Sequence, residues 1–94
     1  MMAKNLIKKI AKDSSRVIFT KHAEKRMCTR KITRTQVLKC LTHGHIVEGP
    51  ALSIKGNMEM KIEVMSAGEI IAVVTALEKD ELGNFVVIIT VFGA

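Results

Sequence analysis

The segments IIAVVTAL (residues 70–77) and FVVIITVF (residues 85–92) decide the fold of this chain. Both are rich in β-branched residues and apolar at nearly every position, which is typical of central strands in a sheet. The charged residues 78–84 between them predict a hairpin loop. Upstream, residues 58–64 alternate apolar and charged side chains, the period-two pattern of a half-buried strand.

The first half of the chain has helical patterns instead. Residues 1–12 place apolar side chains at helical spacing with lysines opposite, so we expect a short amphipathic helix. Residues 17–19, Val-Ile-Phe, predict a short strand or an extended anchor. Thr20 is a candidate N-cap for a second helix that ends near Thr29, because its hydroxyl can accept from a free amide of the first turn.

A third helix has a clearer start and end. Thr33 and Gln36 form a T-x-x-Q capping box, and Gly44 is a natural helix-ending residue. The order helix, strand, helix, helix and then about four antiparallel strands predicts an α+β fold, with helices packed on one side of a meander. We expect one domain over residues 1–94, with 1–15 as an N-terminal helical extension and 16–92 as the core.

Chain length and hydropathy bear on the cellular location of the protein. Ninety-four residues suffice for a single domain. The longest apolar runs have the length of strands, well short of the roughly 20 residues that a membrane helix needs. Lysines at positions 8, 9 and 12 interrupt any apolar stretch of a signal peptide. We therefore expect a cytoplasmic protein without a membrane partner.

Two cysteines, Cys28 and Cys40, fit a reducing compartment, where we expect buried free thiols rather than a disulfide. The chain has no C-x-x-C pair and no Cys/His ligand spacing. The sequence therefore predicts no metal site and no cofactor.

Charge divides the chain into two unequal halves. Residues 1–45 hold twelve Lys and Arg against two acids, a net charge of +10. Residues 46–94 hold three against seven, a net charge of −4. A basic field on one side attracts phosphate backbones, so a nucleic acid is the favoured partner. The alternative is a solvated basic face that keeps the protein soluble.

The segment TKHAEKRMCTR (residues 20–30) could carry chemistry. His22, Arg26 and Arg30 are spaced i, i+4 and i+8 on one helix, so they lie along one face. A histidine exchanges a proton near neutral pH, and guanidinium groups bind phosphate through paired hydrogen bonds. Cleavage of RNA by its own 2′-hydroxyl needs such groups, namely an acid, a base and positive charge at the phosphorus.

A structural interpretation of the same residues stays open. A histidine near a helix start often only caps or packs, and the arginines could pair with Glu48 or Glu63 of the sheet. The histidines that flank Gly44 fit charge compensation at a helix end better than catalysis.

These residues resemble a known family. The string F-T-K-H-A-E-x-R-M-x-x-R-x-I-T (residues 19–33), the passage H-G-x-I-V-E (residues 43–48) and the closing I-I-T-V-F (residues 88–92) are similar to the bacterial domain-of-unknown-function family 4258. That family is similar to the RelE and BrnT toxins and to the barnase–colicin–RelE grouping of small, metal-independent ribonucleases.

The resemblance implies a RelE-like core, with helices on a curved, mostly antiparallel sheet of four to five strands and an active cleft across it. It suggests that His22, Arg26, Arg30 and the strand residue Thr90 face one site. The chain departs from its relatives in having no Tyr and no Trp, which leaves three phenylalanines for base stacking. Lys61, the only basic residue within the central strand segments, could replace a phosphate-binding arginine.

The sequence therefore favours an RNA-binding protein, a toxin-type endoribonuclease that could act on ribosome-bound messenger RNA or on transfer RNA. In this hypothesis His22 is the acid or base, the two arginines neutralise the phosphate, and Thr90 orients it. Further basic residues would bind the nucleic acid: Lys21, Lys25, Lys31, Arg34 and Lys61. An acidic antitoxin would be the protein partner.

Two alternatives stay open: a non-catalytic basic module that binds nucleic acid or an acidic protein, and an interaction subunit that dimerises through an edge strand. The sequence allows a monomer or a homodimer.

Overall fold

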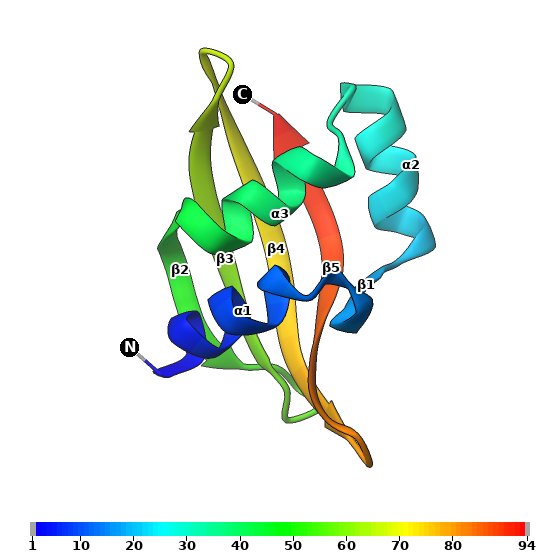
Figure 1. Ribbon diagram of the computed structural model, residues 1–94, viewed down its shortest axis with the longest axis vertical. Helices are drawn as coiled ribbons and strands as arrows, with labels where there is room; N and C mark the ends of the chain where they lie inside the picture. Colours follow the sequence, from blue (N-terminus) through cyan, green and yellow to red (C-terminus); the bar gives the residue numbers. More distant parts are fainter. Residues whose placement is uncertain (1, 94) are drawn as a thin grey trace.

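The computed structural model describes residues 2–93, apart from the side chains of residues 2–4 and 14. Three α-helices precede most of one five-stranded sheet (Figure 1). The elements in chain order are α1 (Met2–Lys12), the 3-10 helix η1 (Ser14–Arg16), β1 (Val17–Phe19), α2 (Lys21–Arg30), α3 (Arg34–His43), β2 (His45–Leu52), β3 (Met58–Ser66), β4 (Glu69–Asp80) and β5 (Gly83–Gly93). The predicted α+β class is confirmed.

The sheet has the strand order β1-β5-β4-β3-β2, so the apolar segments that decide the fold form its interior strands β4 and β5. Strands β2 to β5 form an antiparallel meander. Strand β1 adds to the edge in parallel, with Val17 opposite Val86 and Phe19 opposite Ile88. Residues 17–19 are thus a strand rather than only an extended anchor.

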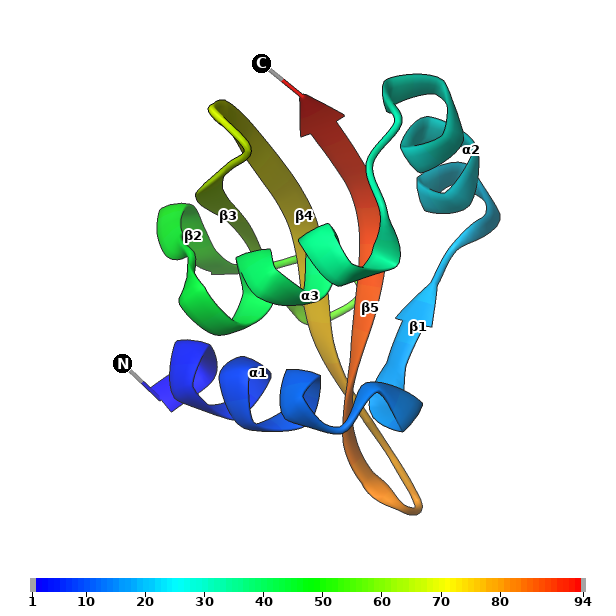
Figure 2. The ribbon, with the colours of Figure 1, turned by 45° about the horizontal axis from the view of Figure 1, so that its top comes forward.

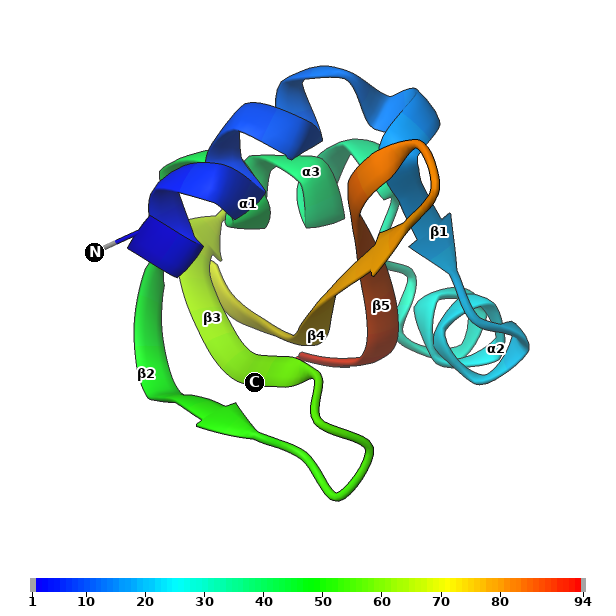
Figure 3. The same cartoon turned by 90° about the horizontal axis from the view of Figure 1, so that it is seen from below.

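One side of the sheet carries the core, because α1 and α3 cover it and the strands curve around them (Figure 3). Alternate strand residues such as Ile62, Val73 and Ile88 point to this side and are at most 1% exposed. They join Val37 and Leu41 of α3 in one buried cluster. Burial of each such side chain stabilises the fold by about 1.5–3 kcal/mol.

Helix α1 belongs to the same core. Ile7 and Ala11 are buried in the cluster, and the helix packs on α3 and β5 (Figure 2). The apolar side chains at helical spacing that predicted this helix are therefore the ones that attach it. The segment that the sequence sets apart as an extension is a packed layer of the fold.

The predicted helix boundaries are confirmed. The Thr20 hydroxyl accepts from the Ala23 amide at 3.0 Å, and both reciprocal bonds of the Thr33–Gln36 capping box form. Gly44 ends α3 with an extended backbone. A Cβ there would collide with the carbonyl oxygens of Cys40 and Glu63, so close packing between α3 and β3 requires the glycine.

The cysteine prediction is half correct. Both thiols are free, and Cys40 is fully buried, where desolvation raises its pKa to about 12. Cys28, however, is exposed. The buried stripe of α2 consists of Ala23 and Met27 only, and the next residue along a helix turns away from such a stripe.

Helix α2 lies apart from the other two helices, at the β5 edge of the sheet (Figures 2 and 3). It packs against β5. We call the side of β2–β5 that faces away from α1 and α3 the open face. Within residues 2–93, no helix is both long and apolar enough to cross a membrane.

Candidate nucleic-acid interface

The strand register places a row of side chains across the open face. Glu48 of β2 is opposite Lys61 of β3, which is opposite Val74 of β4, which is opposite Thr90 of β5. Lys61 and Val74 each lie between two buried residues of their strands, so this row projects away from α1 and α3. The parallel row contains Glu63, Ala72 and Phe92.

His22 lies at the end of the first row. Its Nε2 is 3.1 Å from the Thr90 hydroxyl oxygen, a hydrogen bond between α2 and β5. The start of α2 is held against the same strand, because the Thr20 hydroxyl lies 3.0 Å and 3.1 Å from the carbonyl oxygens of Ile88 and Ile89 and can donate to either. The N-cap that begins the helix therefore also positions His22 beside Thr90.

Arg26 follows one helical turn after His22. Its guanidinium carbon is 5.4 Å from the centre of the Phe92 ring. Its Nε is buried and has no hydrogen-bond partner among residues 2–93. A buried donor without a partner is costly to the fold.

Lys61 approaches Phe92 from β3. Its ammonium is 5.4 Å from the same ring centre and 3.4 Å from a carboxylate oxygen of Glu48. Arg26 and Lys61 therefore bring positive charge to one ring from two different elements. Cation–ring contacts of this length are weak to moderate in strength and leave both cations able to bind an anion.

The remaining predicted residues are more dispersed. Arg30 is exposed at the end of α2, on the face of His22 and Arg26, and has no ion pair within the described part of the chain. Arg34 is held elsewhere: its guanidinium carbon lies 4.3 Å from the centre of the Phe19 ring and one of its nitrogens 3.4 Å from Glu24. The exposed basic residues of the same region are Lys21, Lys25 and Lys31.

Within residues 2–93, neither Arg26 nor Arg30 forms an ion pair with the sheet carboxylates Glu48 and Glu63. Glu48 pairs with Lys61, and residues 2–93 contain no ion pair of Glu63. His22 is exposed and Arg26 is half-buried. Within residues 2–93, neither His22 nor Arg26 forms an ion pair with a carboxylate.

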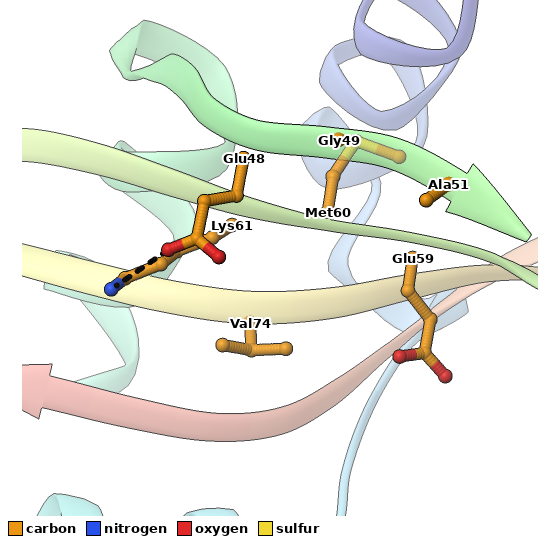
Figure 4. Close-up of a pocket in the computed structure, with 7 residues that line it drawn as sticks. All are labelled: Glu48, Gly49, Ala51, Glu59, Met60, Lys61 and Val74. Carbon is orange, nitrogen blue, oxygen red and sulfur yellow. Dashed lines mark ion pairs between the residues drawn. The ribbon is translucent and has the colours of Figure 1, made fainter. Parts of the chain in front are cut away.

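Hollows adjoin the rows on the open face, and two of them lie toward the β2–β3 loop. The first, about 250 Å³, is lined by Lys61, Val74 and the Gly49 bulge of β2, and the Glu48–Lys61 pair closes one side of it (Figure 4). Gly49 has φ +84°, and a Cβ there would lie 2.8 Å from the Glu59 carbonyl oxygen, so the bulge requires glycine. A larger hollow of about 640 Å³ continues past Glu59 to the β2–β3 loop.

Sequence reasoning missed two features of this surface, the Glu48–Lys61 pair and the position of Phe92 between two cations. The alternation in residues 58–64 does place Lys61 on the solvent side of β3, and Phe92 is two residues beyond Thr90 on the same side of β5. These two positions along the strands could have indicated that Lys61 and Phe92 lie on the same side of the sheet.

Comparison with known proteins identifies the chain at the level of a family. No curated protein and no solved structure gives a significant match. A family model described as a domain of unknown function matches residues 19–93, which include α2, α3, β2 to β5 and every residue of the two rows. The chain therefore belongs to the domain of unknown function family DUF4258.

Proposed function

We propose that this protein binds RNA in the cytoplasm and is a metal-independent endoribonuclease of toxin type. The observation that carries the proposal is the His22–Thr90 hydrogen bond at 3.1 Å, with Arg26 and Lys61 at the same end of the open face. One group that exchanges protons thus lies beside two cations, and the net charge of residues 1–45 favours a polyanion.

The proposed reaction is attack of a ribose 2′-oxygen on the adjacent phosphorus. The bond from the 2′-oxygen to phosphorus forms, and the bond from phosphorus to the 5′-oxygen breaks. The 2′-hydroxyl proton passes to a base, and the departing 5′-oxygen receives a proton. His22 serves one of these two transfers, and Thr90 fixes the orientation of its ring.

Arg26 and Lys61 stabilise the negative charge that grows on the phosphoryl oxygens. The guanidinium of Arg26 carries further N–H groups that can donate to such an oxygen. Lys61 exchanges Glu48 for the phosphate, which costs little because an exposed ion pair is weak. Arg30 and the exposed lysines of α2 contact phosphates farther along the strand.

The experiment that tests the proposal compares His22→Ala with His43→Ala. Both histidines lie outside the buried core, but His43 ends α3 on the other side of the sheet. Labelled total RNA is incubated with each variant in the presence of a chelator. We expect His22→Ala to lose about 100-fold or more of the rate and His43→Ala to retain it, with products that carry 2′,3′-cyclic ends. Full activity of His22→Ala would remove His22 from the mechanism.

An acidic antitoxin is the proposed protein partner. Next to the open face, Leu52 and Ile54 are 70% and 107% exposed and line the 640 Å³ hollow. An antitoxin segment that carries acidic residues opposite α2 and apolar residues opposite this hollow would cover the site. Relief of growth inhibition on co-expression of an acidic protein encoded beside this chain would support the pairing, and unchanged inhibition would contradict it.

Binding without cleavage is the second candidate, and the exposed position of Arg30 and the α2 lysines favours it, because they can bind phosphates whether or not His22 reacts. It predicts salt-sensitive RNA binding and intact RNA after prolonged incubation. Appearance of cyclic-ended fragments that depend on His22 would exclude it.

A further inference from the structure

The three phenylalanines each lie beside a cation, but two of these pairs are closed. Arg34, at 4.3 Å from the centre of Phe19, is also paired with Glu24. Arg16, at 5.5 Å from the centre of Phe85, donates to Asp80 at 2.8 Å and to the Gly83 carbonyl at 3.1 Å. In both cases the cation is tied to an acid, so the pair is a self-contained structural contact.

Phe92 differs in three respects. Two cations lie over its ring, each 5.4 Å from the ring centre, and one of them, Arg26, has no carboxylate partner within residues 2–93. The side chain is 36% exposed. Its cross-strand neighbour is Ala72, whose short side chain leaves a hollow of about 150 Å³ beside the ring.

The hollow has the size and chemistry of a base subsite. Its walls are Ile70, Ala72, Phe92 and Gly93, and Lys61 and Glu63 provide the polar rim. A volume of about 150 Å³ can hold a six-membered aromatic ring. Every nucleobase has a flat π-face that stacks on an aromatic side chain, and cations beside the ring bind the phosphate that follows the base.

The geometry points to Phe92 as a stacking platform for one unpaired base, so that the site takes single-stranded RNA; this inference rests on the proposed function. A base within a duplex is stacked on both sides and cannot lie against a side chain on a sheet, whereas a base in a loop or single strand can. Phe92 is thus a specificity-determining residue, and α2 supplies contacts to the backbone.

The absence of Trp from the chain permits a direct test. Phe92→Trp gives the protein a single indole, which lies on the platform. In the matched control Phe85→Trp, the single indole lies on the β4–β5 hairpin beside Arg16. The probe is a 2′-O-methyl decauridylate, which cannot be cleaved by its own 2′-oxygen. We expect the strand to quench the indole of Phe92→Trp but not that of Phe85→Trp, and a duplex that contains the same strand to quench neither.

A second variant measures the affinity. Phe92→Leu keeps an apolar side chain but removes the ring, and thermal melting verifies that it folds. Fluorescence anisotropy should show a loss of about 5- to 140-fold for the single strand and little change for the duplex.

The outcomes separate the two proposals. Salt-sensitive binding of the strand with no quenching at position 92 and no loss in Phe92→Leu would overturn the platform and leave the proposed RNA binding intact. Failure of the wild-type protein to bind either RNA would overturn the proposed function itself. Equal quenching at positions 92 and 85 would also contradict the platform, because the signal would not be local.

Discussion

Replacement of Thr90 by Val should remove the contact that orients the His22 ring and leave the imidazole itself in place. Valine has nearly the same shape as threonine, so β5 and its pairing with β4 should be preserved. The only loss is the hydroxyl whose oxygen is 3.1 Å from Nε2 of His22. Thr90 is half-buried and His22 is exposed, so water can replace part of the lost bond.

The magnitude follows from the worth of one such bond. A neutral side-chain hydrogen bond contributes about 0.5–1.5 kcal/mol net. If the bond holds the ring in its reactive orientation, its loss slows cleavage by about 2- to 13-fold. The free energy of unfolding should fall by no more than the same amount, because the bond joins two surface groups.

The assay is the initial rate of cleavage of a labelled single-stranded RNA as a function of pH, with urea unfolding measured in parallel. Thr90→Ser restores the hydroxyl and should restore the rate and the pH profile, although it lacks the methyl group. Wild-type rates and an unchanged pH profile in Thr90→Val would refute the positioning role. A loss of rate in Thr90→Ser as large as in Thr90→Val would also refute it, since the hydroxyl would then be irrelevant.

Three further predictions concern the charged groups and a helix cap. Arg26→Met should weaken RNA binding and lower the slope of log affinity against log salt by about 0.7. Arg34→Met should leave the slope nearly unchanged, because Arg34 lies over the Phe19 ring of β1 and not beside the two rows of the open face; equal slopes in both variants would contradict the assignment. The hydrogen bond from Arg16 lowers the pKa of Asp80 in the folded state, so wild type should be more stable to unfolding than Asp80→Asn above the unfolded pKa of about 3.9 and should lose this advantage as the pH falls through the lowered folded pKa. Urea unfolding of both proteins at several pH values tests this, and a stability difference that grows in acid would refute it. Thr33→Ala removes the side chain that caps α3 and should cost about 1 kcal/mol in urea unfolding, and an unchanged midpoint would show that the capping box contributes nothing.

The local features of the fold could be predicted because each rests on a short pattern. The alternation in residues 58–64 defines β3, and the hydroxyls of Thr20 and Thr33 mark the starts of two helices. The parallel pairing of β1 with β5 could not be predicted, because it joins Val17 to Val86 across nearly the whole chain. Three residues carry too little pattern to choose an edge, an orientation and a register.

The arrangement of the candidate site was predictable to the same extent. The spacing of His22 and Arg26 places both on one side of α2, and both side chains contact β5, His22 at Thr90 and Arg26 at Phe92. The contact of Lys61 with Glu48 depends on register shifts in β2 around Gly49, and such shifts have no alternation signature. The same limit applies to the hollow beside Phe92, because it requires the cross-strand neighbour to be known.

The proposed RNA site lies on α2 and the open face, and amide chemical-shift mapping with the uncleavable decauridylate tests it most directly. We expect the largest shifts on His22, Arg26, Lys61, Thr90 and Phe92. Shifts confined to the lysines of α1, on the far side of the sheet, would contradict it.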